Sequence, residues 1–270
     1  MNAARYSALV RLAFADRLTY RGEALIGLFV AAARVLLAYI LWSAVFGDRL
    51  EVGGMGLRAV MSYYLVAAFL RLFNQSDRYV WEFSSEIRSG NFSKYLIRPV
   101  DPLRWFLSVA AGRSLFHAGL AAIAALVVYL AVSAVSGGAA FVSPDPLGLL
   151  LAVPVAALGL SALALIDFMT SLLAFRFMDI SAFHLVKGNL VELASGALVP
   201  LALMPGWARS LCSLTPFPAL ASLPAELWLG GGREGLPLAV GLLVAWNLAL
   251  YGAARLVFAS LSGRYEEVGA

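Results

Sequence analysis

The residues that could do chemistry are few, and none of them forms a recognisable catalytic or metal-binding group. The two histidines, His117 and His184, lack further ligand residues at zinc-site spacing, and the single cysteine, Cys212, cannot form a disulfide within the chain. Neither a G-x-S-x-G nor an H-E-x-x-H motif occurs. Two glycines have P-loop spacing, but Leu236 occupies the position of the lysine. We therefore predict that this chain is not an enzyme, holds no metal and cannot hydrolyse ATP.

Ionisable residues inside long apolar segments are the stronger candidates for function. Each costs roughly 2.5–3.5 kcal/mol to insert into a membrane, so such residues usually face protein or water. They are Arg34, Arg71, Arg113, Asp167, Glu192 and Arg255. One explanation is ion pairing between helices, for example of Arg113 with Asp167 or Glu192. The other is a polar vestibule that receives an anionic or zwitterionic head group from the inner leaflet, and the sequence does not choose between them.

The elements that position these residues are predicted to be transmembrane helices. Of the 270 residues, 61% are hydrophobic and 13% are charged, whereas soluble domains have about 45–50% apolar and about 25% charged residues. Because about 20 apolar residues cross a bilayer as one helix, six spans are predicted. They cover residues 24–46, 55–73, 105–135, 147–173, 183–204 and 236–260. The sequence therefore predicts an all-α integral membrane protein with one transmembrane domain over residues 1–270.

The basic residues between the spans predict the orientation of the chain. Twelve Lys and Arg residues lie in the set of segments that includes both termini, and only four lie in the opposite set. Basic segments stay in the cytoplasm, so we predict cytoplasmic termini in a bacterial inner membrane. All six charges within the spans then fall in the cytoplasmic half. The net charge of +4 follows the same pattern, so we do not expect nucleic-acid binding.

Two further segments are predicted to lie at the membrane surfaces. Residues 1–23 place apolar side chains such as Tyr6, Val10 and Ala13 on one face, which favours an amphipathic helix in the inner interface. Arg17 falls on that face and would have to snorkel. Residues 204–235 are apolar but broken by prolines, which favours re-entrant or interfacial helices on the outer face. A cytoplasmic tail and an ordinary extracellular loop are the respective alternatives.

The cytoplasmic segment between the second and third spans carries the clearest local signals. Residues 77–89 are predicted to form a helix, which Gly90 ends. Asn91 is predicted to cap a second short helix that ends at Pro99. Asp101 then suits an N-cap, because proline follows at the first position of the next helix. Since so many residues fix its ends, we expect this segment to be rigid.

The same segment resembles a known family. Residues 86–103, EIRSGNFSKYLIRPVDPL, are similar to the cytoplasmic loop of type-2 ATP-binding-cassette exporter permeases, and most similar to the branch with E-x-R-x-G followed by L-x-R-P-x-D-P-L. The N-terminal helix, the six spans and the broken segment after the fifth span also resemble that family. The resemblance implies that residues 74–104 form the coupling loop, with a coupling helix that docks into an ATPase. Its transmission residues would be Glu86, Arg88, Gly90, Arg98 and Pro99.

The resemblance also implies partners and a function. Two permease chains, identical or paralogous, would form a pore in the lipid membrane, and separate ATPase subunits would bind ATP and Mg²⁺, so no cofactor is expected on this chain. The leading hypothesis is therefore the transmembrane subunit of an ATP-driven exporter. The alternative is an ion- or proton-coupled secondary transporter that uses Asp167 or Glu192 as its coupling carboxylate. Co-purification of an ATPase would distinguish the two.

Overall fold

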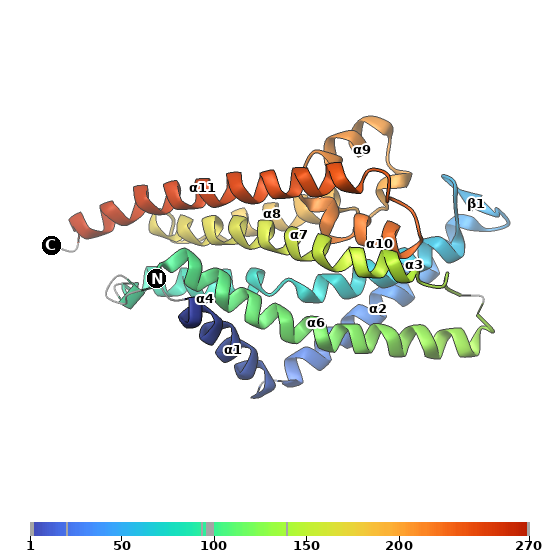
Figure 1. Cartoon of the computed structure of the whole chain (residues 1–270), viewed down its shortest axis with the longest axis horizontal. Helices are drawn as coiled ribbons and strands as arrows, with labels where there is room; N and C mark the ends of the chain where they lie inside the picture. Colours follow the sequence, from blue (N-terminus) through green and yellow to red (C-terminus); the bar gives the residue numbers. More distant parts are fainter. Residues whose placement is uncertain (1–2, 20, 93, 96–99, 139, 269–270) are drawn as a thin grey trace.

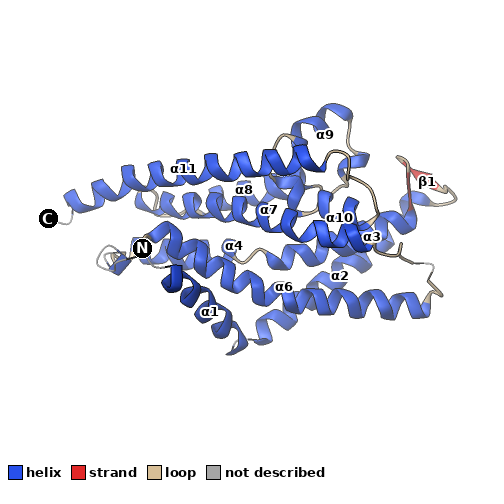
Figure 2. Cartoon of the chain, in the orientation of Figure 1, coloured by secondary structure: helices blue, strands red, loops and turns tan. Residues whose placement is uncertain are grey.

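The structure is a computed structural model that describes the whole chain except residues 1–2, 20, 93, 96–99, 139 and 269–270 (Figure 1). Most of the described chain is helical (Figure 2). The α-helices are α1 (Ala3–Thr19), α2 (Arg21–Phe46), α3 (Leu57–Leu70), α4 (Ser76–Arg88), α6 (Pro102–Val135), α7 (Pro146–Leu172), α8 (Ser181–Ser195), α9 (Gly206–Ser213), α10 (Ser222–Trp228) and α11 (Leu236–Val268). Short 3-10 helices are η1 (Arg71–Phe73), η2 (Leu173–Phe175), η3 (Leu201–Leu203) and η4 (Phe217–Leu220). The strands β1 (Glu51–Val52) and β2 (Met55–Gly56) form an antiparallel hairpin.

The long helices run between two ends of an elongated bundle. Figure 1 shows both termini at one end, which is also where α4 is joined to α6. The β1–β2 hairpin, α9 and α10 lie toward the other end, while α6, α7 and α11 extend along the bundle. This arrangement is the one expected when successive helices cross a membrane in alternating directions.

Four helices are long and apolar enough to cross a membrane. They are Ile26–Phe46, Pro102–Val135, Pro146–Phe175 and Leu236–Leu261, and they confirm helices at the first, third, fourth and sixth predicted spans. The second and fifth predicted spans coincide with α3 and α8, which have 14 and 15 residues. At about 1.5 Å per residue, α3 and α8 are shorter than the usual span, so membrane crossing by these two stays a prediction.

The predicted end of the fifth span is wrong. Helix α8 ends at Ser195, well before Met204, because Gly196 takes a left-handed conformation with φ +82°. The Tyr63 hydroxyl donates a hydrogen bond to the Gly196 carbonyl at 2.7 Å, and a Cβ at Gly196 would lie 2.5 Å from the Tyr63 oxygen. Only glycine fits such a close approach with positive φ. The irregular outer segment therefore begins at residue 196.

Helix α1 confirms the predicted N-terminal helix and packs obliquely across α6 (Figure 1). Ala13 is buried in this contact, and Gly112 of α6 faces the backbone of Val10 so closely that a side chain at 112 would collide with it. Leu12 and other apolar side chains on the outer side stay exposed. The predicted snorkelling of Arg17 is wrong, because its side chain is largely buried and points toward α4. Location of α1 in the membrane interface stays a prediction.

The predicted outer segment, residues 204–235, forms the short helices α9, η4 and α10, of which the last two pack on the spans. Helix α10 and η4 lie against α7, where Gly148 and Gly159 permit close approach to the backbones of Leu227 and Ala219. The Trp228 indole donates a hydrogen bond to the Val142 carbonyl at 3.2 Å. These contacts give the segment a fixed shape.

Candidate functional site

Helix α4 confirms the helix predicted from residues 77–89. Before its first turn, the Asn74 side-chain oxygen accepts a hydrogen bond from the Asp77 N–H at 3.4 Å. At its other end, the Gly90 N–H donates to the Ile87 carbonyl at 3.3 Å, and Gly90 has φ +77°. The predicted role of Gly90 as a helix-ending glycine is therefore confirmed. The helix is amphipathic, with Tyr79, Ile87 and neighbouring apolar residues buried.

Glu86 fixes the turn that follows α4. Its carboxylate accepts hydrogen bonds from the Lys94 ammonium at 2.5 Å and from the Tyr95 hydroxyl at 2.6 Å. Burial, followed by the nearby Tyr79 and Glu86, raises the pKa of Tyr95 well above its usual range, so Tyr95 remains a donor. Glu86 thus holds the shape of the loop from within. The predicted sites Arg98 and Pro99 lie outside the described residues.

The end of α4 forms an exposed surface together with the connection between α7 and α8. Arg88 is exposed, and its guanidinium donates to the Met178 carbonyl at 3.3 Å. Met178 is 89% exposed and Phe177 38% exposed. We call this surface the coupling tip and define it as Ser85, Arg88, Ser89, Gly90, Phe177 and Met178. Sequence reasoning missed Phe177 and Met178, although two large apolar residues in a short connection between helices are a usable signal.

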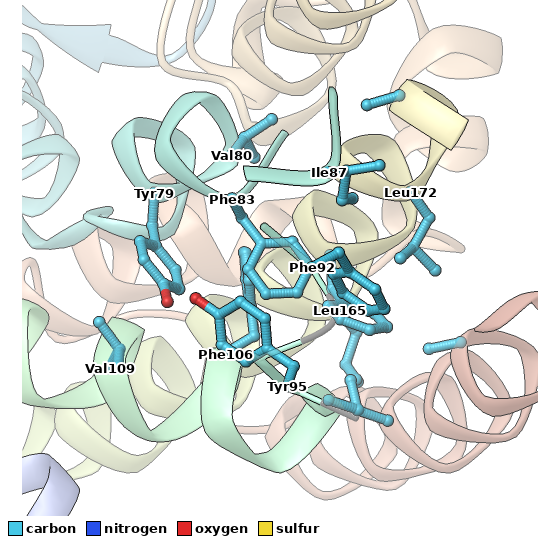
Figure 3. Close-up of a cluster of buried hydrophobic side chains, with 14 of the residues drawn as sticks. Tyr79, Val80, Phe83, Ile87, Phe92, Tyr95, Phe106, Val109, Leu165 and Leu172 are labelled. Carbon is cyan, nitrogen blue, oxygen red and sulfur yellow. The ribbon is translucent and has the colours of Figure 1, made fainter. Parts of the chain in front are cut away.

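Aromatic rings join α4 to the spans (Figure 3). The Phe83 ring lies 5.9 Å from that of Phe92, 5.6 Å from that of Phe106 in α6, and 5.8 Å from that of Phe168 in α7. Phe92 also lies 6.1 Å from Phe258 of α11. Phe83, Phe92, Phe106 and Phe168 are almost completely buried. Because a close-packed core transmits displacement, α4 cannot shift without moving α6, α7 or α11.

Arg113 pairs with α4 and not with either of its predicted partners. Its guanidinium donates two hydrogen bonds, each 2.8 Å, to the Glu82 carboxylate. Arg17 of α1 lies 3.9 Å from the same carboxylate. The prediction that Arg113 pairs with Asp167 or Glu192 is therefore wrong, because α4 folds back along α6 and places Glu82 within reach first. The Glu82 carboxylate links α1, α4 and α6.

Asp167 belongs to a second ionic group, which links α4, α7 and α8. Its side chain is completely buried and accepts hydrogen bonds from the Lys187 ammonium at 2.5 Å and the Ser76 hydroxyl at 2.6 Å. Lys187 also bonds Asp77 at 2.8 Å, and the His184 ring lies 3.2 Å from the same Asp77 oxygen. Burial alone would raise the pKa of Asp77, but the charge and hydrogen bond of Lys187 hold it below its usual range.

Asp101 confirms the predicted N-cap of α6 and also binds a span residue. Its side chain accepts a hydrogen bond from the Arg104 N–H at 3.0 Å, and Pro102 occupies the first helical position. The other carboxylate oxygen lies 3.4 Å from the Arg255 guanidinium of α11. Arg255 therefore lies apart from the other span charges.

The remaining predicted residues meet at a cavity. The cavity has a volume of about 470 Å³ and is lined by residues of α2, α3, η1, α4 and α8. Glu192 of α8 lies 3.5 Å from the Arg34 guanidinium of α2 and in direct contact with that of Arg71. Lys187 and His184 line the cavity as well. The structure thus brings Arg34 and Glu192 together, as ion pairing between helices predicts, and surrounds them with open space, as a vestibule requires.

Comparison with known families decides the identity. A family model described as ABC-2 family transporter protein matches residues 32–269, which include α4, most of the cavity lining, most of the first long apolar span and the other three in full. The chain belongs to this family. A comparison with curated proteins finds no match.

Membership makes this ABC-2 chain a transmembrane permease of an ABC transporter. The family is a membrane component without an ATPase domain, and its members in general work with an ABC ATPase. The apolar helices accordingly belong to a multi-pass membrane protein. Sequence reasoning identified Asp167 and Glu192 in this permease but missed Asp77 and Glu82 of α4, whose acidic side chains face basic residues of the spans.

Proposed function

We propose that this ABC-2 permease is the transmembrane subunit of an ATP-driven exporter in a bacterial inner membrane, with both termini in the cytoplasm. A second permease chain would complete the translocation path, and ATP and Mg²⁺ would bind a separate ATPase subunit. The observation that carries the proposal is the position of the coupling tip. It stands at the exposed end of a helix whose other side lies in one core with α6, α7 and α11.

Three sets of contacts would transmit a displacement of the coupling tip to the spans. The aromatic core resists compression, the Glu82 carboxylate holds α4 to Arg113, and Asp77 holds it to Lys187. Because Glu86 braces the turn after α4, force applied at Arg88 would reach the helix instead of deforming the loop. Glu86 thereby acts in coupling as a positioning residue. Roles for Arg98 and Pro99 in the same loop remain predictions.

Helix α8 supports the participation of a second permease chain. Of its 15 residues only Ser195 is buried, so no other part of the described chain covers most of its surface. Asn189 is exposed among large apolar side chains such as Leu185 and Leu190. An amide is costly in lipid, whereas another helix can satisfy it. A second permease chain packed against α8 would cover this face and place α8 beside the path.

The geometry does not favour the alternative of ion- or proton-coupled transport. Asp167 is completely buried and bonded to Lys187 and Ser76. Glu192 contacts two arginines. A coupling carboxylate has to bind and release its ion readily, whereas Asp167 is sealed from solvent and both carboxylates already contact basic side chains.

Co-purification of the ATPase tests the proposal. Gly90→Val should distort the coupling tip, because a β-branched residue is strongly disfavoured at φ +77°. Arg88→Glu should weaken docking by reversing a charge. The matched controls are Gly54→Val, at a left-handed glycine with φ +79° in the β1–β2 hairpin, and Arg49→Glu, at an exposed arginine near it.

We expect both tip variants to reach the membrane at normal levels but to lose co-purification of the ATPase or its transport-linked activity. Both control variants should retain the co-purification and the activity. If Gly90→Val and Arg88→Glu retain the ATPase and transport at the wild-type rate, the coupling tip is not where the ATPase acts.

A further inference from the structure

The cavity between α2, η1, α4 and α8 has an excess of positive charge at its wall. Four basic side chains line it, against two acidic ones, Asp77 and Glu192. The basic residues are Arg34, Arg71, Arg78 and Lys187. Lys187 is already matched by Asp77 and by Asp167 behind it. Arg34 and Arg71 share a single carboxylate, that of Glu192, so an excess of positive charge remains at this pair.

Arg34 and Arg71 have the capacity to bind a further anion. Their side chains are 46% and 45% exposed, and one Glu192 carboxylate serves both guanidinium groups. Each guanidinium carries five N–H donors in a planar fork, and a carboxylate can occupy only some of them. Phosphate matches the remaining donors in geometry and charge.

Two residues that line the same cavity each have a buried polar atom without a hydrogen-bond partner among the described residues. The Gln75 amide nitrogen donates to the Leu72 carbonyl at 2.9 Å, which leaves its buried oxygen without a partner. His184 places Nε2 3.2 Å from Asp77, and its buried Nδ1 has no hydrogen-bond partner. In the neutral tautomer that donates from Nε2, Nδ1 is an acceptor. Buried polar atoms are normally satisfied, so both atoms indicate a ligand that brings N–H or O–H donors.

The rest of the lining suits an acyl chain. Ile26 and Val30 line the cavity and are exposed on the outside of α2. An apolar chain that leaves the cavity along these side chains would therefore remain in an apolar environment. A volume of about 470 Å³ is within the usual range for small-ligand sites.

We propose that this cavity binds the head group of an amphiphile in which a phosphate is joined to an amine or hydroxyl donor, as in phosphoethanolamine. Arg34 and Arg71 bind the phosphate, and Gln75 and His184 accept hydrogen bonds from the donor. The acyl chain lies along the exposed apolar side chains of α2. Binding requires only this chain, whereas identification of the amphiphile as cargo also rests on the proposed export function.

Short-chain lipids that differ only in the head group test the proposal. The full chain, purified in a neutral maltoside detergent, is titrated with dioctanoyl phosphatidylethanolamine, dioctanoyl phosphatidylcholine and dioctanoylglycerol, and binding is followed by native mass spectrometry and by the shift in Tm. Phosphatidylcholine keeps the phosphate but has no N–H donor, and dioctanoylglycerol has no phosphate. We expect apparent affinity to fall in that order, by about tenfold for each charge-assisted hydrogen bond that the head group can no longer make.

Variants assign each part of the head group to its residues. Arg34→Gln or Arg71→Gln should reduce the preference for phosphate, while Gln75→Met should abolish only the preference for ethanolamine over choline. Glu192→Gln removes the competing carboxylate and should tighten phosphatidylethanolamine binding severalfold, which a misfolded protein cannot do. Arg49→Gln, at an exposed arginine away from the cavity, is the matched control.

Equal binding of phosphatidylethanolamine and dioctanoylglycerol by the wild type, or no gain in Glu192→Gln, would overturn the proposal. ATP-dependent movement of labelled phosphatidylethanolamine by the complex reconstituted with its ATPase would identify the ligand as cargo. Head-group-selective binding without such movement would identify a resident lipid, with the binding site confirmed. Failure of ATPase co-purification leaves these binding measurements unaffected, so the two proposals fail separately.

Discussion

Replacement of Lys187 by methionine should destabilise the permease strongly, because it leaves a buried carboxylate without its counter-ion. The Asp167 side chain is 0% exposed and that of Lys187 is 11% exposed. The Lys187 ammonium nitrogen lies 2.5 Å from an Asp167 carboxylate oxygen. Removal of one partner of a buried ion pair typically costs about 3–5 kcal/mol. Each kcal/mol lowers Tm by roughly 2–4 °C in a domain of 150–250 residues, so we expect Tm to fall by roughly 6–20 °C. Methionine is similar to lysine in length, so the loss is mainly electrostatic.

A matched control and a double variant separate this effect from a general loss of packing. Lys94→Met breaks another lysine–carboxylate pair of 2.5 Å, with Glu86, but Lys94 is 40% exposed. Exposed pairs contribute about 0.2–1 kcal/mol, so Tm should fall by less than about 4 °C. In the double variant Lys187→Met/Asp167→Asn the buried charge is gone, and the amide can still accept the Ser76 hydrogen bond. We expect this variant to recover at least half of the loss.

The assay is the temperature at which the detergent-solubilised protein loses its monodisperse peak in fluorescence-detected size-exclusion chromatography. Each variant is expressed at the same level and heated in parallel with the wild type. If Lys187→Met lowers Tm by no more than Lys94→Met does, the buried ion pair does not stabilise the fold. If the double variant is as unstable as Lys187→Met alone, loss of ion pairing is the wrong explanation.

Three further predictions concern topology, packing and pH. In a Cys212→Ala background, an impermeant thiol reagent added to intact cells should label Arg49→Cys but not Arg88→Cys, and the reverse pattern would overturn the proposed orientation. Gly112→Val should collide with the backbone of α1 and cost about 1–3 kcal/mol, seen as a lower Tm, unless α1 packs elsewhere. Because basic neighbours outweigh burial and lower the pKa of Asp77, its stabilising contribution is complete above its ordinary pKa of about 3.9 and is lost as pH falls through the lower folded value. The Tm of wild type should therefore exceed that of Asp77→Asn at pH 7, and the difference should narrow below about pH 4; a constant difference would contradict this assignment.

Local signals in the sequence were sufficient to predict several features of the candidate site. The N-cap at Asp101 and the left-handed Gly90 depend on residues within four positions along the chain. Both were therefore visible in the order of residues alone. The same Asp-Pro signal recurs at Asp145, which caps α7 through the Gly148 N–H at 2.5 Å, and it could have located the start of that helix equally well.

Contacts between distant segments were not predictable in the same way. Arg113 and Glu82 are 31 positions apart, and they meet because α4 lies along α6. Periodicity identifies the apolar face of α4 but not the helix against which that face packs. The end of α8 depends likewise on Tyr63, whose hydroxyl binds Gly196 from 133 positions away. The sequence could therefore predict that span charges pair, but it could not predict their partners.

Lys187 connects the two proposals physically. It lines the cavity, and it bonds both Asp77 near the start of α4 and Asp167 of α7. A displacement of α4 that moved Asp77 away from Lys187 would leave Lys187 with a single acidic partner and make the cavity wall more positive. Motion driven from the coupling tip would then strengthen binding of an anionic head group. Because coupling between two sites is reciprocal, a bound head group would in turn favour the displaced position of α4.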